Sequence, residues 1–121
     1  MSLMQMLGLG GNAQTISAEE AHSQQVAGEL VIVDIRQPNE WAQTGIPAGS
    51  YRITLGTQNF APQIKGLAEE NPDSKIALFC ASGMRSGSAI GQLKAAGIEN
   101  LYNIKGGFGA WSRGRLPIDP A

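Results

Sequence analysis

The chain has 121 residues, of which 42% are hydrophobic and 16% are charged, and its formal net charge is −1. This length and composition fit one folded domain and argue against a disordered chain. The nine Lys and Arg residues form no run of like charge, which argues against a nucleic-acid-binding surface, and one Cys with one His does not make a closed zinc site.

The first twelve residues differ in composition from the rest of the chain. Residues 1–12 are rich in Met, Leu and Gly and carry no charged side chain. These residues are too few to span a bilayer, and they lack the basic start of a secretory signal. Met1-Ser2-Leu3 before a second Met is typical of a vector-derived start. We expect a flexible leader at residues 1–12 and a single domain at residues 13–121. A segment that touches lipid or a partner is the alternative.

Helices and strands alternate through the first part of the domain. The capping box Ser17-Ala18-Glu19-Glu20 predicts a helix that runs to about Ala27. The apolar run at residues 30–33 predicts a strand that is covered on both faces. Pro38 suits the first turn of a short helix, which Gly45 ends.

The rest of the chain continues this alternation. The expected elements are a loop at 46–50, a short strand at 51–53, a helix at 63–70, a strand at 75–79, a helix with the apolar stripe Ile90, Leu93 and Ala96, a strand at 101–104, and a short helix after Gly106-Gly107. This order predicts an α/β fold with a central, mostly parallel sheet flanked by helices.

Cys80 is the only cysteine, and it follows the strand expected at 75–79. It therefore lies at the carboxyl edge of a parallel sheet, where ligands bind in open α/β folds. The N–H groups of such a turn and the N-terminus of the next helix favour a thiolate, and Arg85 adds a permanent cation. A buried structural thiol is the alternative for a lone cysteine, but the neighbouring Gly83 and Arg85 favour a nucleophile. One cysteine cannot form an internal disulfide, so the fold does not depend on an oxidising compartment.

Three sequence blocks together resemble the rhodanese-like sulfurtransferase domain. They are Asp-Ile-Arg-Gln-Pro-Asn-Glu-Trp at residues 34–41, Cys-Ala-Ser-Gly-Met-Arg-Ser at 80–86, and Gly-Gly-Phe-Gly-Ala-Trp at 106–111 followed by Leu-Pro at 116–117. The likeness covers nearly the whole chain after the leader and implies the three-layer rhodanese-like fold. One departure is Thr-Gly-Ile at 44–46, where the family often has Gly-His-Ile, a histidine usually attributed to structure rather than chemistry.

The resemblance implies a thiosulfate sulfurtransferase that needs no cofactor or metal. Cys80 would take the sulfane sulfur of a small anionic donor such as thiosulfate, become a persulfide, and pass the sulfur to cyanide, a thiol or a protein acceptor, with ping-pong kinetics. The backbone amides of the loop and a bidentate guanidinium would bind the donor. A glycine would allow the tight turn of the loop. Its donor-binding residues would be Ala81, Ser82, Gly83, Met84, Arg85 and Ser86.

Three charged residues of the first sequence block, at residues 34–41, are expected to support the structure of the site. Arg36 and Glu40 are four apart around a helix start, where an ion pair can brace the loop. Asp34, at a strand end, suits capping or hydrogen bonding to neighbouring loops. Catalytic acids or a metal pair are the alternative. We expect Trp41 and Trp111 to lie in the core or at the rim of the site. We expect His22 to be exposed on the first helix.

The spacing of the loop separates two anion-binding chemistries. Four residues lie between Cys80 and Arg85, whereas cysteine-based phosphatases and related dual-specificity proteins enclose one more. The shorter loop suits a sulfur atom better than a tetrahedral phosphate, so we expect no phosphatase or arsenate reductase. Two other functions stay open: a sulfur carrier or interaction module that serves a dedicated partner without turnover, and a peroxide-responsive thiol. The absence of a signal segment favours the cytoplasm.

Overall fold

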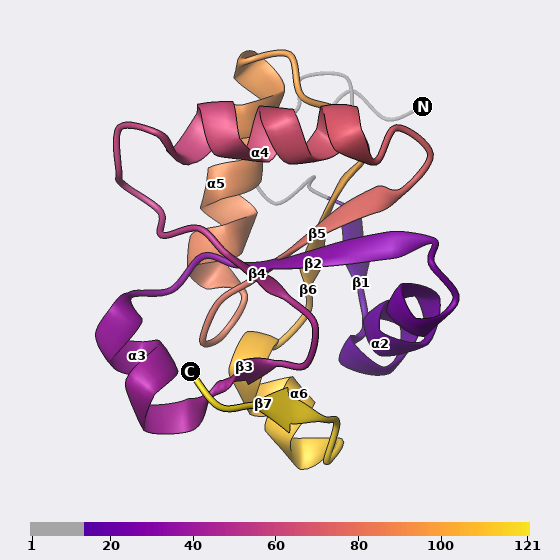
Figure 1. The fold of residues 1–121 in the computed structure, drawn as a ribbon, viewed down its shortest axis with the longest axis vertical. Coiled ribbons are helices and arrows are strands. Elements are labelled where there is room, and N and C mark those ends of the chain that lie inside the picture. The colour runs from indigo at the N-terminus through magenta and orange to yellow at the C-terminus, as the bar shows by residue number, and fades with distance from the viewer. Residues whose placement is uncertain (1–13) are drawn as a thin grey trace, which may run out of the picture.

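The computed structural model describes residues 14–121 (Figure 1). In chain order its elements are β1 (Gln14–Ile16), α2 (Ala18–Val26), β2 (Leu30–Asp34), α3 (Pro38–Thr44), β3 (Ile46–Pro47), β4 (Tyr51–Arg52), α4 (Phe60–Glu70), β5 (Lys75–Phe79), α5 (Met84–Ala95), β6 (Leu101–Ile104), α6 (Gly107–Arg113) and β7 (Ile118–Asp119). The leader expected at residues 1–12 lies outside the described residues. Within the described part of the chain, no helix has the length and apolar character needed to cross a membrane.

Five parallel strands form the central sheet, in the order β1-β6-β5-β2-β4. A separate antiparallel ribbon pairs β3 with β7. Because the strands of the main sheet are parallel, their carboxyl ends meet at one edge, and the loop after β5 opens there between α3 and α6 (Figure 1). The predicted α/β fold with a mostly parallel sheet is confirmed.

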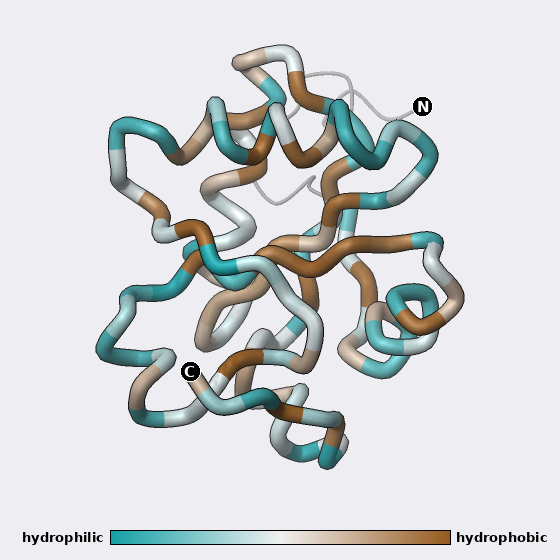
Figure 2. Tube along the Cα trace, viewed as in Figure 1, coloured by the Kyte–Doolittle hydropathy of each residue, from teal (hydrophilic) through white to brown (hydrophobic). Residues whose placement is uncertain are grey.

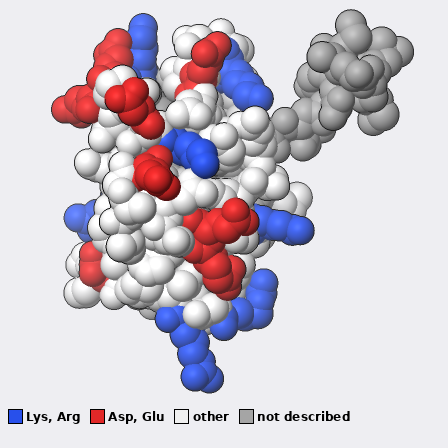
Figure 3. Space-filling view, turned by 90° about the vertical axis from the view of Figure 1, so that its right-hand side faces the viewer, with Lys and Arg blue, Asp and Glu red and all other residues white. Residues whose placement is uncertain are grey.

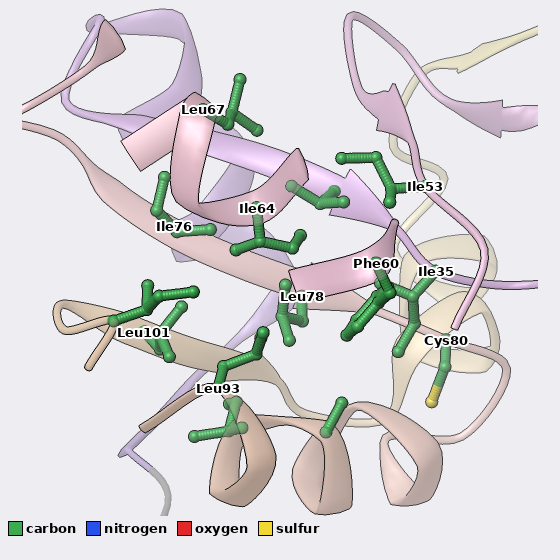
Figure 4. Close-up of a cluster of buried hydrophobic side chains, with 14 residues drawn as sticks. Ile35, Ile53, Phe60, Ile64, Leu67, Ile76, Leu78, Cys80, Leu93 and Leu101 are labelled. Carbon is green, nitrogen blue, oxygen red and sulfur yellow. The ribbon is translucent and has the colours of Figure 1, made fainter. Parts of the chain in front are cut away.

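Helices cover both faces of the sheet, which gives three layers. Side chains alternate along β5, so Ile76 and Leu78 join a core cluster with α4 and α5 (Figure 4). Ala77 and Phe79 join a second cluster with α2 and α6. The central strands are therefore buried on both faces, which explains their continuous apolar runs. Figure 2 shows β2 as a continuous hydrophobic segment through the centre of the molecule.

The helix starts near the site follow the expected capping chemistry. The Oγ of Ser17 accepts the N–H of Glu20 at 3.0 Å and so caps α2. The Glu40 Oε1 accepts the N–H of Gln37 at 3.1 Å, which places a carboxylate over the first turn of α3. Gly45 ends α3 with φ 77°, in the left-handed region that favours glycine. The first turn of α3 thus holds Glu40 at a defined position.

Three expectations about local structure are wrong, and one strand was not predicted. The strand that was not predicted is β1, whose residues pair with β6. Residues 46–47 form β3 rather than a loop, because they pair with β7. Helix α4 begins at Phe60 rather than Gln63, since the Phe60 ring is buried in the core. Ala96 is the exposed C-cap of α5 and is not part of its apolar stripe.

The aromatic side chains lie largely where expected. Trp111 is fully buried, and its Nε1 donates to the carbonyl of Pro117 at 2.9 Å, which fastens the end of the chain to α6. Trp41 is half-buried at the rim, under the guanidinium of Arg52. His22 is half-buried rather than exposed, because α6 packs on α2 and brings the two rings to 5.8 Å in an edge-to-face contact with Trp111.

Candidate active site

Cys80 is the first residue after β5, at the carboxyl edge of the sheet. A three-residue turn then leads into α5, and the last residue of that turn, Gly83, has φ 96°. Glycine adopts this conformation without the steric cost of a side chain. The Cys80 side chain lies at the end of the core cluster, with its sulfur pointing toward the first turn of α5 (Figure 4). The predicted strand-to-helix position of the thiol is confirmed.

Three groups form hydrogen bonds with the Cys80 sulfur. The N–H of Gly83 donates to Sγ at 3.0 Å, the N–H of Ser86 donates at 3.5 Å, and the Ser86 Oγ lies 3.3 Å away. Burial by itself would raise the pKa of Cys80, but the hydrogen bonds from Ser86 and from the backbone N–H groups of the loop outweigh it, so the pKa is lowered. The geometry therefore favours the thiolate, which is the nucleophilic form.

The start of α6 closes the other side of the loop. The N–H of Phe108 donates to the Cys80 carbonyl at 2.8 Å, and the N–H of Gly109 donates to the Ala81 carbonyl at 3.2 Å. A Cβ on Gly107 would lie only 2.0 Å from the Cys80 carbonyl oxygen. Gly107 of the third sequence block must therefore be a glycine, because its backbone approaches the backbone of Cys80 so closely.

Asn103 on β6 is a site residue that the sequence reasoning missed. Its Nδ2 donates to the Gly83 carbonyl at 3.0 Å, and its Oδ1 accepts the Ser86 hydroxyl. The amide therefore ties the sheet to both residues that hold the Cys80 sulfur. The available signal was an amide side chain within the otherwise apolar strand at 101–104, because a polar residue there needs a hydrogen-bonding partner.

The charged residues pair differently from the expectation. Glu40 pairs with Arg85, both contacts being 2.8 Å, and it does not pair with Arg36. The hydrogen bond from Arg85 lowers the pKa of Glu40 to about 2, helped by the Gln37 N–H and opposed by burial. The pair is half-exposed, with 40% of the Arg85 side chain and 25% of the Glu40 side chain accessible. The structure thus joins the first turns of α3 and α5 beside the loop.

Arg36 pairs instead with Asp34, and both side chains are almost fully buried. Its Nε donates to Oδ1 at 3.0 Å and its NH2 donates to Oδ2 at 2.8 Å. The guanidinium also lies 5.2 Å from the ring centres of both Phe79 and Phe108, and it donates to the Gly45 carbonyl. Arg36 therefore links β2, the end of α3 and the start of α6. Within residues 14–121, no cluster of three or more His, Cys, Asp or Glu side chains could hold a metal ion.

Access to the sulfur is limited in this conformation. Cys80 is 0% exposed, whereas Ala81, Ser82 and Met84 are exposed, with Met84 at 79%. The Ser82 Oγ accepts the N–H of Met84 at 3.4 Å, a contact at the exposed rim. A small molecule therefore reaches the Cys80 Sγ only when the loop or the Cys80 side chain moves.

Comparison with known proteins agrees with this fold. The rhodanese-like domain model matches residues 17–114, and the chain belongs to this family. An uncharacterised protein of Synechocystis sp. is 33% identical over 90 residues, which are 73% of this chain and 46% of that protein. The chain thus spans about half the length of that curated relative.

Two solved structures illustrate the range of similar proteins. A Rhodopseudomonas palustris protein of unknown function, described as a possible tyrosine phosphatase, has a TM-score of 0.72 and 29% identity, covering 88% of this chain and 85% of that one. A thiosulfate sulfurtransferase from Pseudomonas aeruginosa has a TM-score of 0.70 and 25% identity, covering 88% of this chain and 20% of that one. The family and the fold are established, and sulfurtransferase chemistry is the activity that they support in general.

Proposed function

We propose that the protein is a sulfurtransferase that moves a sulfane sulfur from thiosulfate or a persulfide donor to a thiophilic acceptor through a Cys80 persulfide. The observation that carries the proposal is the hydrogen bonding of the Cys80 sulfur by the N–H groups of Gly83 and Ser86 and by the Ser86 hydroxyl. These donors stabilise the Cys80 thiolate, so no separate general base is needed to form the nucleophile.

The reaction has two half-reactions that balance. The Cys80 thiolate attacks the outer sulfur of the donor, forms an S–S bond and releases sulfite from thiosulfate or a thiolate from a hydropersulfide. An acceptor, which is cyanide or a thiol, then attacks the outer sulfur of the Cys80 persulfide and releases the Cys80 thiolate. The exposed loop residues Ala81, Ser82 and Met84 would surround the donor, and Arg85 stands at the edge of the same loop.

The loop favours sulfur over phosphate as its cargo. Two backbone N–H groups of the loop are directed at the Cys80 sulfur itself, and four residues separate Cys80 from Arg85. A phosphatase needs free amides around three equatorial oxygens and a cation that is free to hold them. In this protein the Arg85 guanidinium is paired with Glu40. We therefore propose that phosphate esters are not substrates, although one similar structure carries that description.

The test is thiocyanate formation from a sulfur donor and cyanide by the purified protein and by Cys80→Ser. We expect turnover by the wild type and none by the variant. Turnover that survives in Cys80→Ser would refute the proposal. Mass spectrometry separates the carrier alternative, since a stable +32 Da adduct on Cys80 without turnover of any donor would mean sulfur carriage. We place this chemistry in the cytoplasm, where a single free thiol stays reduced.

A further inference from the structure

Arg85 is the cation closest to the catalytic loop, and its charge is already matched. NH1 and NH2 of Arg85 each donate to one oxygen of Glu40 at 2.8 Å, which is the bidentate geometry in which a guanidinium holds a carboxylate or a sulfonate. An oxyanion that bound Arg85 in this way would have to displace Glu40. The face of Arg85 that suits an anionic donor is therefore occupied by a group of the protein itself.

Glu40 is held in this position from its own helix as well. Its Oε1 accepts the N–H of Gln37 at the start of α3, where the helix dipole also favours a negative charge. The pKa of Glu40 is about 2, so the carboxylate is charged at any pH at which the thiolate of Cys80 reacts. Displacing Glu40 would break contacts with both Arg85 and α3.

The remaining charges near the loop do not restore a positive field. Asp34 and Arg36 neutralise each other in the buried pair. Among the described residues that hydrogen bond to the loop, Arg85 and Glu40 are the charged ones, and their charges cancel. Arg113 is exposed, and its NH1 faces Gly109 of α6. The chain as a whole has a net charge of −1, and both signs are interspersed on the face shown in Figure 3.

We propose that Glu40 is a specificity-determining residue that cancels the charge of Arg85 and so selects hydropersulfide donors, R–S–SH, over dianionic thiosulfate. A loop without net charge gives a dianion little to offset its lost hydration, and the Cys80 thiolate repels it. A hydropersulfide carries at most one negative charge, so both costs are smaller for it. Its outer sulfur joins Cys80, its S–S bond breaks, and R–S⁻ leaves. The exposed Met84 at the rim offers the R group an apolar contact.

This inference rests on the proposed function and deepens it. The test is kcat/KM for thiosulfate and for 2-hydroxyethyl hydropersulfide, with cyanide as acceptor, in the wild type, Glu40→Gln, Arg85→Gln and the double variant. Glutamine keeps a capping side chain at the start of α3. Glu69→Gln, exposed near the end of α4, removes the same charge far from the loop and serves as the control.

The ratio of kcat/KM for thiosulfate to that for hydropersulfide should follow the net charge of the pair. We expect it to rise about tenfold in Glu40→Gln, to fall in Arg85→Gln, and to return close to the wild-type value in the double variant. The thiosulfate kcat/KM of Glu40→Gln should also fall more steeply with salt than that of the wild type. Glu69→Gln should leave the ratio unchanged.

Two results would overturn the inference. One is a ratio that does not rise in Glu40→Gln. The other is a double variant whose ratio stays as low as that of Arg85→Gln, which would mean that Arg85 binds thiosulfate regardless of Glu40. If the wild type forms no thiocyanate from either donor, the proposed function fails, and this inference fails with it. That outcome differs from an unchanged ratio among active variants.

Discussion

The Ser86 hydroxyl allows a quantitative test of how the loop activates Cys80. It lies 3.3 Å from Sγ, and its single hydrogen is shared between two acceptors, the sulfur and the Oδ1 of Asn103. The orientation of the Asn103 amide is fixed, because its Nδ2 must donate to the Gly83 carbonyl. With a protonated thiol the hydroxyl donates to Asn103, and with a thiolate it turns to the sulfur. Ser86→Ala removes this donor and leaves the two backbone donors in place.

The expected size of the effect follows from the strength of such a bond. A hydrogen bond to a charged group contributes about 1.5–3 kcal/mol, or about one to two pKa units. The hydroxyl gives up its bond to Asn103 when it turns to the thiolate, so the net contribution lies at the low end. We therefore expect Ser86→Ala to raise the pKa of Cys80 by about one unit.

The assay is the rate of alkylation of Cys80 by iodoacetamide as a function of pH. The thiolate reacts, so the rate rises with pH and levels off above the pKa. In the wild type, the lowered pKa of Cys80 places the midpoint below that of an ordinary thiol. In Ser86→Ala the midpoint should move to higher pH. Ser88→Ala, an exposed serine on the same helix, should leave it in place. An unchanged midpoint in Ser86→Ala would refute the role given to the hydroxyl.

Two further predictions concern how the scaffold holds the loop. Asp34→Asn removes the negative charge that pairs with the buried Arg36. Urea denaturation should therefore show a free energy of unfolding that is lower by about 3 kcal/mol. A decrease in the free energy of unfolding of less than about 1 kcal/mol would contradict the importance of this pair. Gly107→Ala forces a Cβ against the Cys80 carbonyl, so it should lower stability by at least about 2 kcal/mol and abolish thiocyanate formation. Gly91→Ala, where a Cβ meets nothing within 4 Å, is the control and should be neutral or stabilising; equal losses in both variants would show that close backbone approach is not the cause.

Local patterns in the sequence predicted the elements that carry the site. The apolar strand before Cys80, the turn at Gly83 and the helix after it follow from short-range chemistry, and the structure has each of them. The capping side chain of Ser17 and the glycine that ends α3 are equally local. The placement of Cys80 at the sheet edge then followed because parallel strands end together.

The ion pairs were mispredicted for a physical reason. The rule that pairs residues four apart applies within a helix, but α3 begins at Pro38, so Arg36 precedes the helix and Glu40 lies inside it. Arg36 therefore turns back to Asp34, while Glu40 meets Arg85 from a helix 45 positions away in sequence. Such a partner depends on how α3 and α5 dock, which no short window of sequence contains.

Asn103 and the short strands were missed for a related reason. Asn103 acts through residues on α5 and the loop before it, so its role appears only when β6 lies beside them. The β3–β7 ribbon contains two residues from each strand, too few for any periodic pattern. Strand β1 was missed because its three residues follow the leader and gain their structure from pairing with β6.

The central claim is that Cys80 carries a transferable sulfur. The most direct measurement is intact-protein mass spectrometry of the wild type after incubation with 2-hydroxyethyl hydropersulfide and again after cyanide is added. We predict a +32 Da adduct on Cys80, its removal by cyanide with release of one thiocyanate per adduct, and no adduct on Cys80→Ser. An unmodified Cys80, or an adduct that cyanide does not remove, would contradict the account.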